Sequence, residues 1–261
     1  MNENGIYDIL ASRYDGINAC VDHSAMADFF LEGAKRFSRR PNTALDLCCG
    51  TGSMLLELAR RGLDMQGADI SPNMLNTARE RLFDEGYTDV LLLCQDMREF
   101  ELYGTVDAIT CCLDSLNHLS SSKELEQVFR LACNYLEYGG ILYFDLNSKY
   151  KYEHVYGDNA YILEEDGMYC GWENFYDKKR GIAEFRLSVF EECEDGSYER
   201  TDAVQREKYF SHRTVLKALK NAGLEFCGVY GSTEFSEPAD TDERLYYFAK
   251  RPEEDQQKNE L

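Results

Sequence analysis

The chain has 261 residues, 44% of them apolar and 29% charged, which suits one large α/β domain with a small insertion. Its formal net charge of −20 argues against binding to DNA or RNA, because proteins that hold phosphate backbones usually present a basic face. No apolar run reaches the roughly 20 residues of a membrane-spanning helix, and residues 1–7 lack the pattern of a signal peptide. We therefore expect a cytoplasmic protein with neither a nucleic-acid nor a membrane partner.

Helices and strands alternate through the first part of the chain. Apolar residues at helical spacing predict helices over 25–37, 53–61, 72–82 and 122–136. Short apolar runs predict strands over 43–48, 64–70, 90–94, 106–112 and 141–145. Ser71 and Pro72 suit the N-cap and first position of the third of these helices. This alternation predicts a parallel sheet with helices on both faces.

The pattern changes after Asn147. Segments of alternating polarity predict antiparallel strands over 161–165, 168–176, 182–191 and 198–210, separated by glycine-containing turns. Phe185 and Leu187 alternate with Glu184 and Arg186, as expected of a sheet with one wet face.

The α/β pattern then resumes. A helix is predicted over 212–222 with Gly223 at its end, followed by strands over 225–230 and 245–250 that can form a closing hairpin. We therefore divide the chain into a main domain, an insertion that is either a lid or a homodimer interface, and a disordered polar tail. Their ranges are 1–150 with 211–250, then 151–210, then 251–261.

The ten cysteines and four histidines show no metal-ligand spacing. No Cys-x-x-Cys occurs, and Cys48-Cys49 and Cys111-Cys112 are adjacent pairs, whose side chains point to opposite sides of a strand. We expect free, largely buried thiols and no bound metal.

A glycine-containing loop, Asp46-Leu47-Cys48-Cys49-Gly50-Thr51-Gly52, connects the first predicted strand to its helix. In open α/β sheets, ligands bind beyond the carboxyl ends of the strands. A dinucleotide loop requires a third glycine where this chain has Leu55, and a phosphate-binding loop requires a lysine that is absent here. The loop therefore favours a ligand without phosphate, such as S-adenosylmethionine.

Acidic residues follow the next two strands. Asp69 ends the second strand, 17 residues beyond Gly52, where a carboxylate can accept both hydrogen bonds of a ribose diol. Asp96 ends the third strand and can accept the exocyclic amine of adenine, while Met97 donates its backbone N–H to the ring.

These three segments, together with Gly67 to Leu75, resemble the class I S-adenosylmethionine-dependent methyltransferases. The string from Val106 to Leu119 is similar to a narrower group of small-molecule enzymes that includes bacterial sugar-amine N-methyltransferases. The resemblance implies a Rossmann-like fold with a mostly parallel seven-stranded sheet and a late antiparallel insertion. It also implies S-adenosylmethionine as the cofactor.

The resemblance assigns the cofactor to eleven positions of this chain. Asp69 would hold the ribose, Asp96 would read adenine, and Tyr14 would close over the cofactor. The family commonly has glycine where this chain has Cys48. The full set is Tyr14, Cys48, Gly50, Gly52, Asp69, Ile70, Met74, Asp96, Met97, Cys112 and Leu113.

The acceptor side is less specified. His118 is the candidate catalytic base, with a hydrogen-bonded structural histidine as the alternative, and Asn117 can orient the acceptor. Trp172 and neighbouring tyrosines of the insertion either line the acceptor pocket or are simply core residues. The expected function is one-step methyl transfer to a small-molecule amine or hydroxyl group. The alternatives are a non-catalytic S-adenosylmethionine-binding module and an NAD-dependent oxidoreductase.

Overall fold

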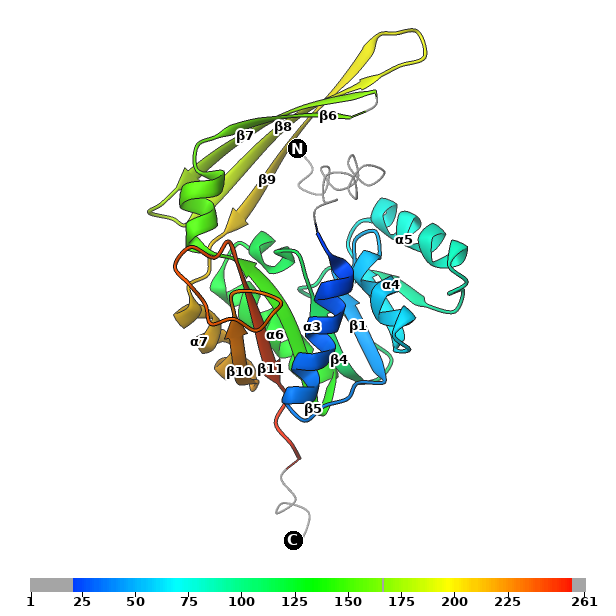
Figure 1. Ribbon diagram of the computed structural model, residues 1–261, viewed down its shortest axis with the longest axis vertical. Coiled ribbons are helices and arrows are strands. Elements are labelled where there is room, and N and C mark those ends of the chain that lie inside the picture. Colours follow the sequence, from blue (N-terminus) through cyan, green and yellow to red (C-terminus); the bar gives the residue numbers. More distant parts are fainter. Residues whose placement is uncertain (1–20, 166, 255–261) are drawn as a thin grey trace.

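In the computed structural model, which describes residues 21–165 and 167–254, seven strands form one sheet in the order β10-β11-β5-β4-β1-β2-β3 (Figure 1). Five neighbouring strands are parallel, and β11 runs antiparallel to β5 and to β10. The prediction of a mostly parallel seven-stranded sheet is confirmed. The strands are β1 Thr43–Leu47, β2 Asp64–Asp69, β3 Leu91–Cys94, β4 Val106–Cys111, β5 Leu136–Asn147, β10 Glu225–Tyr230 and β11 Arg244–Lys250.

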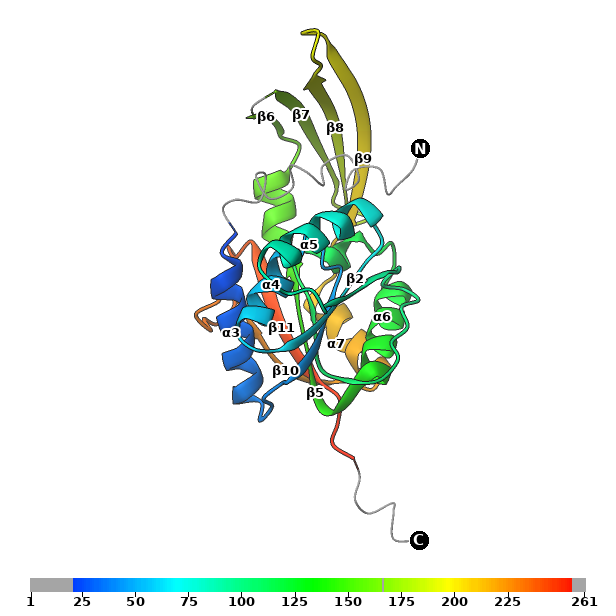
Figure 2. The ribbon, with the colours of Figure 1, turned by 90° about the vertical axis from the view of Figure 1, so that its right-hand side faces the viewer.

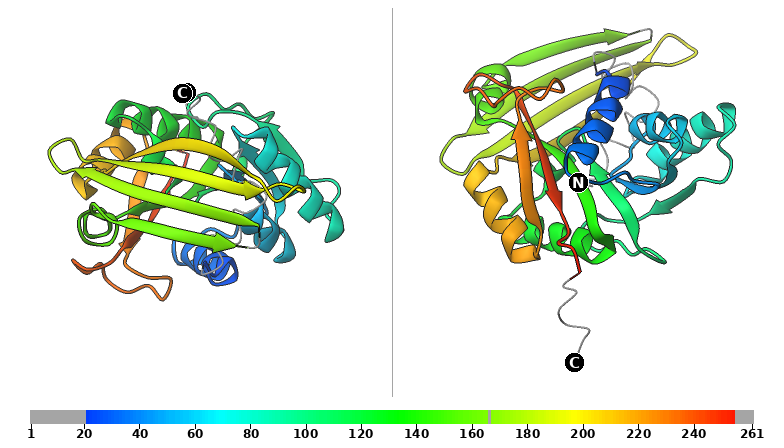
Figure 3. Two further views of the ribbon diagram at one scale, coloured as in Figure 1. Left: turned by 90° about the horizontal axis from the view of Figure 1, so that it is seen from above. Right: turned by 60° about the horizontal axis from the view of Figure 1, so that its bottom comes forward.

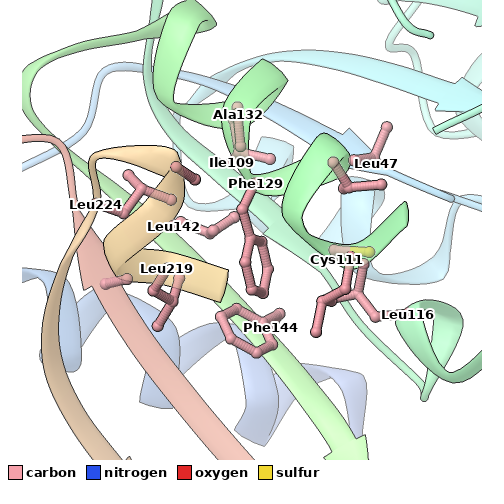
Figure 4. Close-up of a cluster of buried hydrophobic side chains, with 14 of the residues drawn as sticks. Leu47, Ile109, Cys111, Leu116, Phe129, Ala132, Leu142, Phe144, Leu219 and Leu224 are labelled. Carbon is pink, nitrogen blue, oxygen red and sulfur yellow. The ribbon is translucent and has the colours of Figure 1, made fainter. Parts of the chain in front are cut away.

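Helices cover both faces of this sheet (Figure 2). One face carries α3 His23–Arg36, α4 Ser53–Arg60 and α5 Pro72–Asp84, and the other carries α6 Ser122–Tyr135 and α7 His212–Ala222. Successive strand residues point to opposite faces, so Ala44 packs toward α3 and α4 while Leu45 and Leu47 pack toward α6 and α7. Figure 4 shows this second core, in which Phe129 of α6 lies against Phe144 of β5.

Element boundaries follow local chemistry. The Asp22 side chain caps α3, accepting the backbone N–H of Ala25 at 2.8 Å, so this helix begins two residues before the predicted start. Ser71 caps α5 as predicted, and Gly223 ends α7 in the left-handed conformation. The fifth strand begins at Leu136 rather than at residue 141, because Leu136 leaves α6 in an extended conformation and pairs with β4.

The insertion forms a separate four-stranded antiparallel sheet, as predicted, over the carboxyl-end edge of the main sheet (Figures 1 and 3). Its strands are β6 Ala160–Glu165, β7 Met168–Asp177, β8 Ile182–Glu192 and β9 Tyr198–Lys208. Two short elements were not predicted, the 3-10 turn η1 Ser115–His118 and the π-helical η2 Lys151–Tyr156. Tyr152 of η2 packs with Phe185 and Leu187 on the apolar face of the inserted sheet.

The nine cysteines that the structure describes are free thiols, as predicted. Within the described ranges no helix is both long enough and apolar enough to cross a membrane. Of the predicted tail, residues 251–254 are described and form no helix or strand, and 255–261 lie outside the described residues.

Candidate active site

A cavity of about 990 Å³ lies between the carboxyl-end edge of the main sheet and strands β8 and β9 of the inserted sheet. The loops after β1, β2, β3 and β4 line one side of it, and side chains of the insertion line the other. This edge contains the switch in strand order between β1 and β4, where α/β sheets characteristically bind ligands. A smaller cavity of about 40 Å³ continues beneath the first loop.

Of the residues predicted to hold the cofactor, nine of the eleven line one or both cavities. Those in the large cavity are Cys48, Gly50, Asp69, Ile70, Met74, Asp96, Met97 and Leu113, and Cys112 lines the small one. Gly52 is the N-cap of α4 and lines neither of these two cavities. Tyr14 lies outside the described residues.

The loop after β1 turns through three residues with positive φ, Cys48 at 60°, Gly50 at 53° and Gly52 at 79°. Side chains rarely adopt this region, which explains why a glycine is the common choice where this chain has Cys48. A Cβ added at Gly52 would lie 3.0 Å from the Cβ of Ala78 on α5, so this glycine also permits close packing.

Leu55 occupies the position of the missing third glycine and is fully buried. A Cβ added at Gly67 of β2 would lie 2.5 Å from the Cδ1 of Leu55. The close approach of helix and strand that a dinucleotide fold obtains from a glycine on the helix is therefore obtained here from a glycine on the strand.

Asp69 is held in place by the main chain. Its Oδ2 accepts the N–H of Gly50 at 2.9 Å, and its Oδ1 accepts the N–H of Ser71 at 2.9 Å. These bonds tie the end of β2 to the loop after β1 and fix the carboxylate at the cavity wall. Asp69 thus ends β2 and lines the large cavity.

Asp46 is a buried acid at the small cavity to which the sequence motif assigned no separate role. Its Oδ1 accepts the Thr110 hydroxyl at 2.7 Å. Burial, reinforced by the charge of Asp69, raises the pKa of Asp46 to about 7, despite opposing hydrogen bonds. A carboxylate inside an otherwise apolar strand is the signal that could have singled it out.

Asp96 lines the cavity beside Arg98, which was not among the predicted residues. The guanidinium of Arg98 donates to both carboxylate oxygens, and its backbone N–H donates to Oδ1 at 2.8 Å. Burial acts to raise the pKa of Asp96, but the bonds from Arg98 outweigh it and hold that pKa below its ordinary value.

The loop after β4 is shaped by a buried acid of β5. Leu113 and Asp114 both have positive φ, and their N–H groups donate to the carboxylate of Asp145 at 2.8 and 2.7 Å. Arg244 of β11 pairs with Asp145 and, at 2.6 Å, with Asp114. This network was not predicted, because its members come from three separate segments.

His118 lies on the cavity wall, at the end of η1. Its Nδ1 contacts the amide of Gln205 on β9, which joins the main domain to the insertion. Burial lowers the pKa of His118, against the opposing charge of Asp114.

Neither of the two residues predicted to contact the acceptor, Asn117 and Trp172, lines these two cavities. Asn117 is fully buried, with its Nδ2 donating to the carbonyl of Lys208 at 2.8 Å and its Oδ1 accepting the N–H of Asn147 at 2.9 Å. Trp172 lies in β7, outside the cavity lining, and its ring meets Phe185 edge to face. Sequence reasoning instead missed Glu207 of β9, a buried acid that does line the cavity.

Comparison with known proteins matches residues 44–140 to the family model "Methyltransferase domain". The protein named "Putative methyltransferase YqeM" of Bacillus subtilis (strain 168) is 30% identical over 247 residues, covering 94% of this chain and 97% of that protein. A crystal structure of an S-adenosylmethionine-dependent methyltransferase from Clostridium acetobutylicum ATCC 824 superposes with a TM-score of 0.84 at 29% identity, covering 94% and 99% of the two chains. The dTDP-3-amino-3,6-dideoxy-α-D-glucopyranose N,N-dimethyltransferase of Streptomyces fradiae is 34% identical over 109 residues, 41% of each protein.

Proposed function

The chain belongs to the class I S-adenosylmethionine-dependent methyltransferases, and on that premise we propose that it methylates the amine or hydroxyl group of a small molecule bound in the large cavity. The observation that supports this acceptor class is the cavity itself. At about 990 Å³ it has the size of a small-molecule site, and it is closed on one side by the insertion of the same chain.

The residues at the sheet edge fit S-adenosylmethionine. A Cβ added at Gly50 would meet no atom within 4 Å, so the loop leaves open space beside its backbone. Asp69 presents a fixed carboxylate to the same space. When bound, the cofactor supplies a methyl group already activated by its sulfonium.

We assign the holding residues by position along this edge. Gly50, Gly52 and the backbone at Cys48, with Cys112 and Leu113 opposite, would hold the amino-acid part. Asp69 would accept hydrogen bonds from the ribose, and Ile70 and Met74 would flank the adenine. Asp96 and the backbone of Met97 would read its edge, with Arg98 sharing the Asp96 carboxylate. Tyr14 would close over the cofactor.

The chain's own part in transfer is to align the acceptor and exclude water. We propose that the insertion, residues 151–210, acts as a lid rather than a dimer interface, because β8 and β9 form one wall of the cavity. His118 would contact the acceptor on the opposite wall. Asn117, bonded to two backbone segments, would hold η1 in position rather than touch the acceptor.

An amine acceptor has support from two relatives that are named for amino sugars, a Streptomyces fradiae protein that is 34% identical over 109 residues and a Streptomyces venezuelae protein that is 31% identical over 137 residues. An NAD-dependent reaction is disfavoured, because Leu55 fills the place of the third glycine.

The test is incubation of the protein with methyl-labelled S-adenosylmethionine and a metabolite extract, followed by detection of labelled products. We expect label in a small molecule, and its loss with Asp69→Ala at limiting cofactor. Cofactor binding without label transfer to any fraction would favour the non-catalytic module. Label in nucleic acid or protein alone would contradict the acceptor class.

A further inference from the structure

Three ionisable side chains meet at the acceptor end of the cavity. Asp114, His118 and Glu207 each offer an atom, and these atoms all lie within 4.8 Å of one another. Two of the three, His118 and Glu207, line the cavity. They come from opposite sides of it, η1 of the main domain and β9 of the insertion.

Glu207 is the unusual member of this group. It pairs with Ala183 and lies on the same face of the inserted sheet as Phe185, so it is a charged-type residue on the apolar face. Only 6% of it is exposed. A buried carboxyl group of this kind requires either a full set of partners or a ligand.

The partners of Glu207 engage one of its two oxygens. Its Oε2 accepts the Tyr152 hydroxyl at 2.7 Å and the Asn147 side-chain amide at 3.0 Å. Within the part of the chain that the structure describes, Oε1 receives no hydrogen bond. One oxygen is therefore anchored and the other is open to a ligand in the cavity.

Two cationic side chains, Arg244 and Lys151, already lie at this cluster. Asp114 pairs with Arg244 at 2.6 Å, and the Lys151 ammonium donates to the Asn147 side chain at 3.0 Å. With two cationic side chains in place, the cluster suits the gain or loss of one proton better than a divalent metal ion.

On the basis of the function proposed above, we propose that Glu207 holds the ammonium group of a basic amine acceptor through Oε1 and accepts its proton before methyl transfer. The inserted sheet then supplies a catalytic residue, and the acceptor class narrows from amine or hydroxyl to a basic amine. This role differs from that of His118, which lines the facing wall.

The proton balance is simple. Glu207 loses its proton to solvent when a protonated amine binds, and the carboxylate pairs with the ammonium. One proton then moves from nitrogen to Oε1, which frees the nitrogen lone pair to form the new N–C bond as the S–C bond breaks. Glu207 is again neutral, the product leaves as a methylated ammonium, and no other reactant is needed.

The directions of the two pKa shifts agree with Glu207, rather than His118, accepting the proton. Burial, followed by the charge of Asp114, raises the pKa of Glu207 to about 8, against the bonds from Tyr152 and Asn147 and the charge of Lys151. Burial lowers the pKa of His118. Proton transfer from an ammonium costs less free energy when the pKa of the accepting base is closer to that of the ammonium. A hydroxyl acceptor has no ammonium proton to transfer. Tyr156 and Arg244 also face this cluster.

The test follows Glu207 directly in the full-length protein. Glutamate side-chain carboxyls are labelled with ¹³C, S-adenosylhomocysteine is added to saturation, and pH titrations are recorded alone, with ethylamine and with ethanol. Glu207→Gln identifies the resonance. We expect ethylamine to lower the Glu207 midpoint by about 1 to 3 pH units, as an adjacent cation does, and ethanol to leave it unchanged.

One control resonance and one variant make the outcome specific. Glu184 lies on β8 in the same cavity, paired with Arg186 and Arg206, and its resonance should not respond to ethylamine. Tyr152→Phe removes a bond that lowers the pKa of Glu207, so it should move the midpoint up and preserve the ethylamine response. If Glu207→Gln does not fold, this variant identifies the resonance instead.

If S-adenosylhomocysteine binds but the titration midpoint of Glu207 does not change with ethylamine, or changes equally with ethanol, the proposal is overturned. Calorimetry on the same samples reports that binding separately. Failure to bind S-adenosylhomocysteine would overturn the proposed function, and this inference with it.

Discussion

The two sheets build their sides of the cavity by different means. On the main sheet, backbone groups fix the site: two N–H groups hold Asp69, and Asp145 holds two more. On the inserted sheet, side chains make the wall, and Gln205 and Glu207 are placed by bonds to other side chains. The main-sheet side therefore requires particular residues at particular φ angles, whereas the inserted side can exchange residues without changing its backbone.

This difference explains which half of a site carries a motif. Backbone-held positions restrict the residue type through φ and through close packing, as at Gly52. A side chain on a half-wet strand is restricted only by its partners. A binding site for a shared cofactor suits the first kind of construction, and a site for a variable acceptor suits the second.

The largest effect should come from breaking the charge network that supports the main-sheet side. Arg244→Met removes the partner of Asp145 and Asp114, whose side chains are 0% and 17% exposed. We expect a loss of about 3 to 5 kcal/mol in unfolding free energy, because a buried carboxylate is left unpaired. Urea denaturation measures it.

Arg206→Met is the matched change on the inserted sheet. Arg206 pairs with Glu184 but its side chain is 59% exposed, so we expect a cost of at most about 1 kcal/mol. Equal losses of unfolding free energy in the two variants would contradict the difference drawn here between the main-sheet side and the inserted side of the cavity.

The pH dependence of the unfolding free energy tests the inserted side of the cavity through Glu207. Its folded pKa is raised above the unfolded value, so its contribution is complete below about pH 4.5 and is lost as the pH rises through about 8. Glu207→Gln should therefore gain about 2 to 4 kcal/mol relative to wild type between pH 5 and pH 9. Parallel stability curves for the two proteins would show that Glu207 ionises normally.

The same pH dependence of stability should include a contribution from Asp46, whose pKa is raised to about 7. Asp46→Asn keeps an acceptor for Thr110 and should flatten the fall in stability between about pH 4 and 7. A fall in stability as steep as that of the wild type over this pH range would contradict the raised pKa of Asp46.

A small effect is expected when glycine replaces Cys48, whose φ is 60°. Cys48→Gly relieves backbone strain but loses side-chain contacts, so stability should change by no more than about 1 kcal/mol. Cys48→Val places a β-branched residue at positive φ and should cost about 1 to 3 kcal/mol. Thermal unfolding of the pair measures the difference, and equal melting temperatures would show that φ does not restrict this position.

The sequence predicted the main sheet and the residues along its carboxyl-end edge because both depend on local rules. Apolar periodicity gave the strands, and the spacing of Gly50, Asp69 and Asp96 along successive strand ends placed them together. The early start of β5 at Leu136 was missed because α6 joins it without a turn residue. The π-helical η2 was missed because its tyrosines are also typical of strands.

The acceptor side was predicted less well because its residues meet only through tertiary contacts. Asn117 lies beside the catalytic candidate in sequence, yet its side chain is used for backbone hydrogen bonds. Trp172 has the residue type of a binding pocket but faces the core of the insertion. Glu207 carried one readable signal, a charged residue in register with the apolar positions of the neighbouring strand.

The most direct test of the account is a calorimetric titration of S-adenosylmethionine into three proteins, wild type, Asp69→Ala and Asp64→Ala. Asp64 is an exposed acid at the opposite end of the same strand, so it controls for charge and for strand content. We predict that Asp69→Ala weakens binding about 100-fold, as expected from losing hydrogen bonds to a charged acceptor, and that Asp64→Ala binds as wild type does. Equal affinity in all three would contradict the placement of the cofactor at this edge.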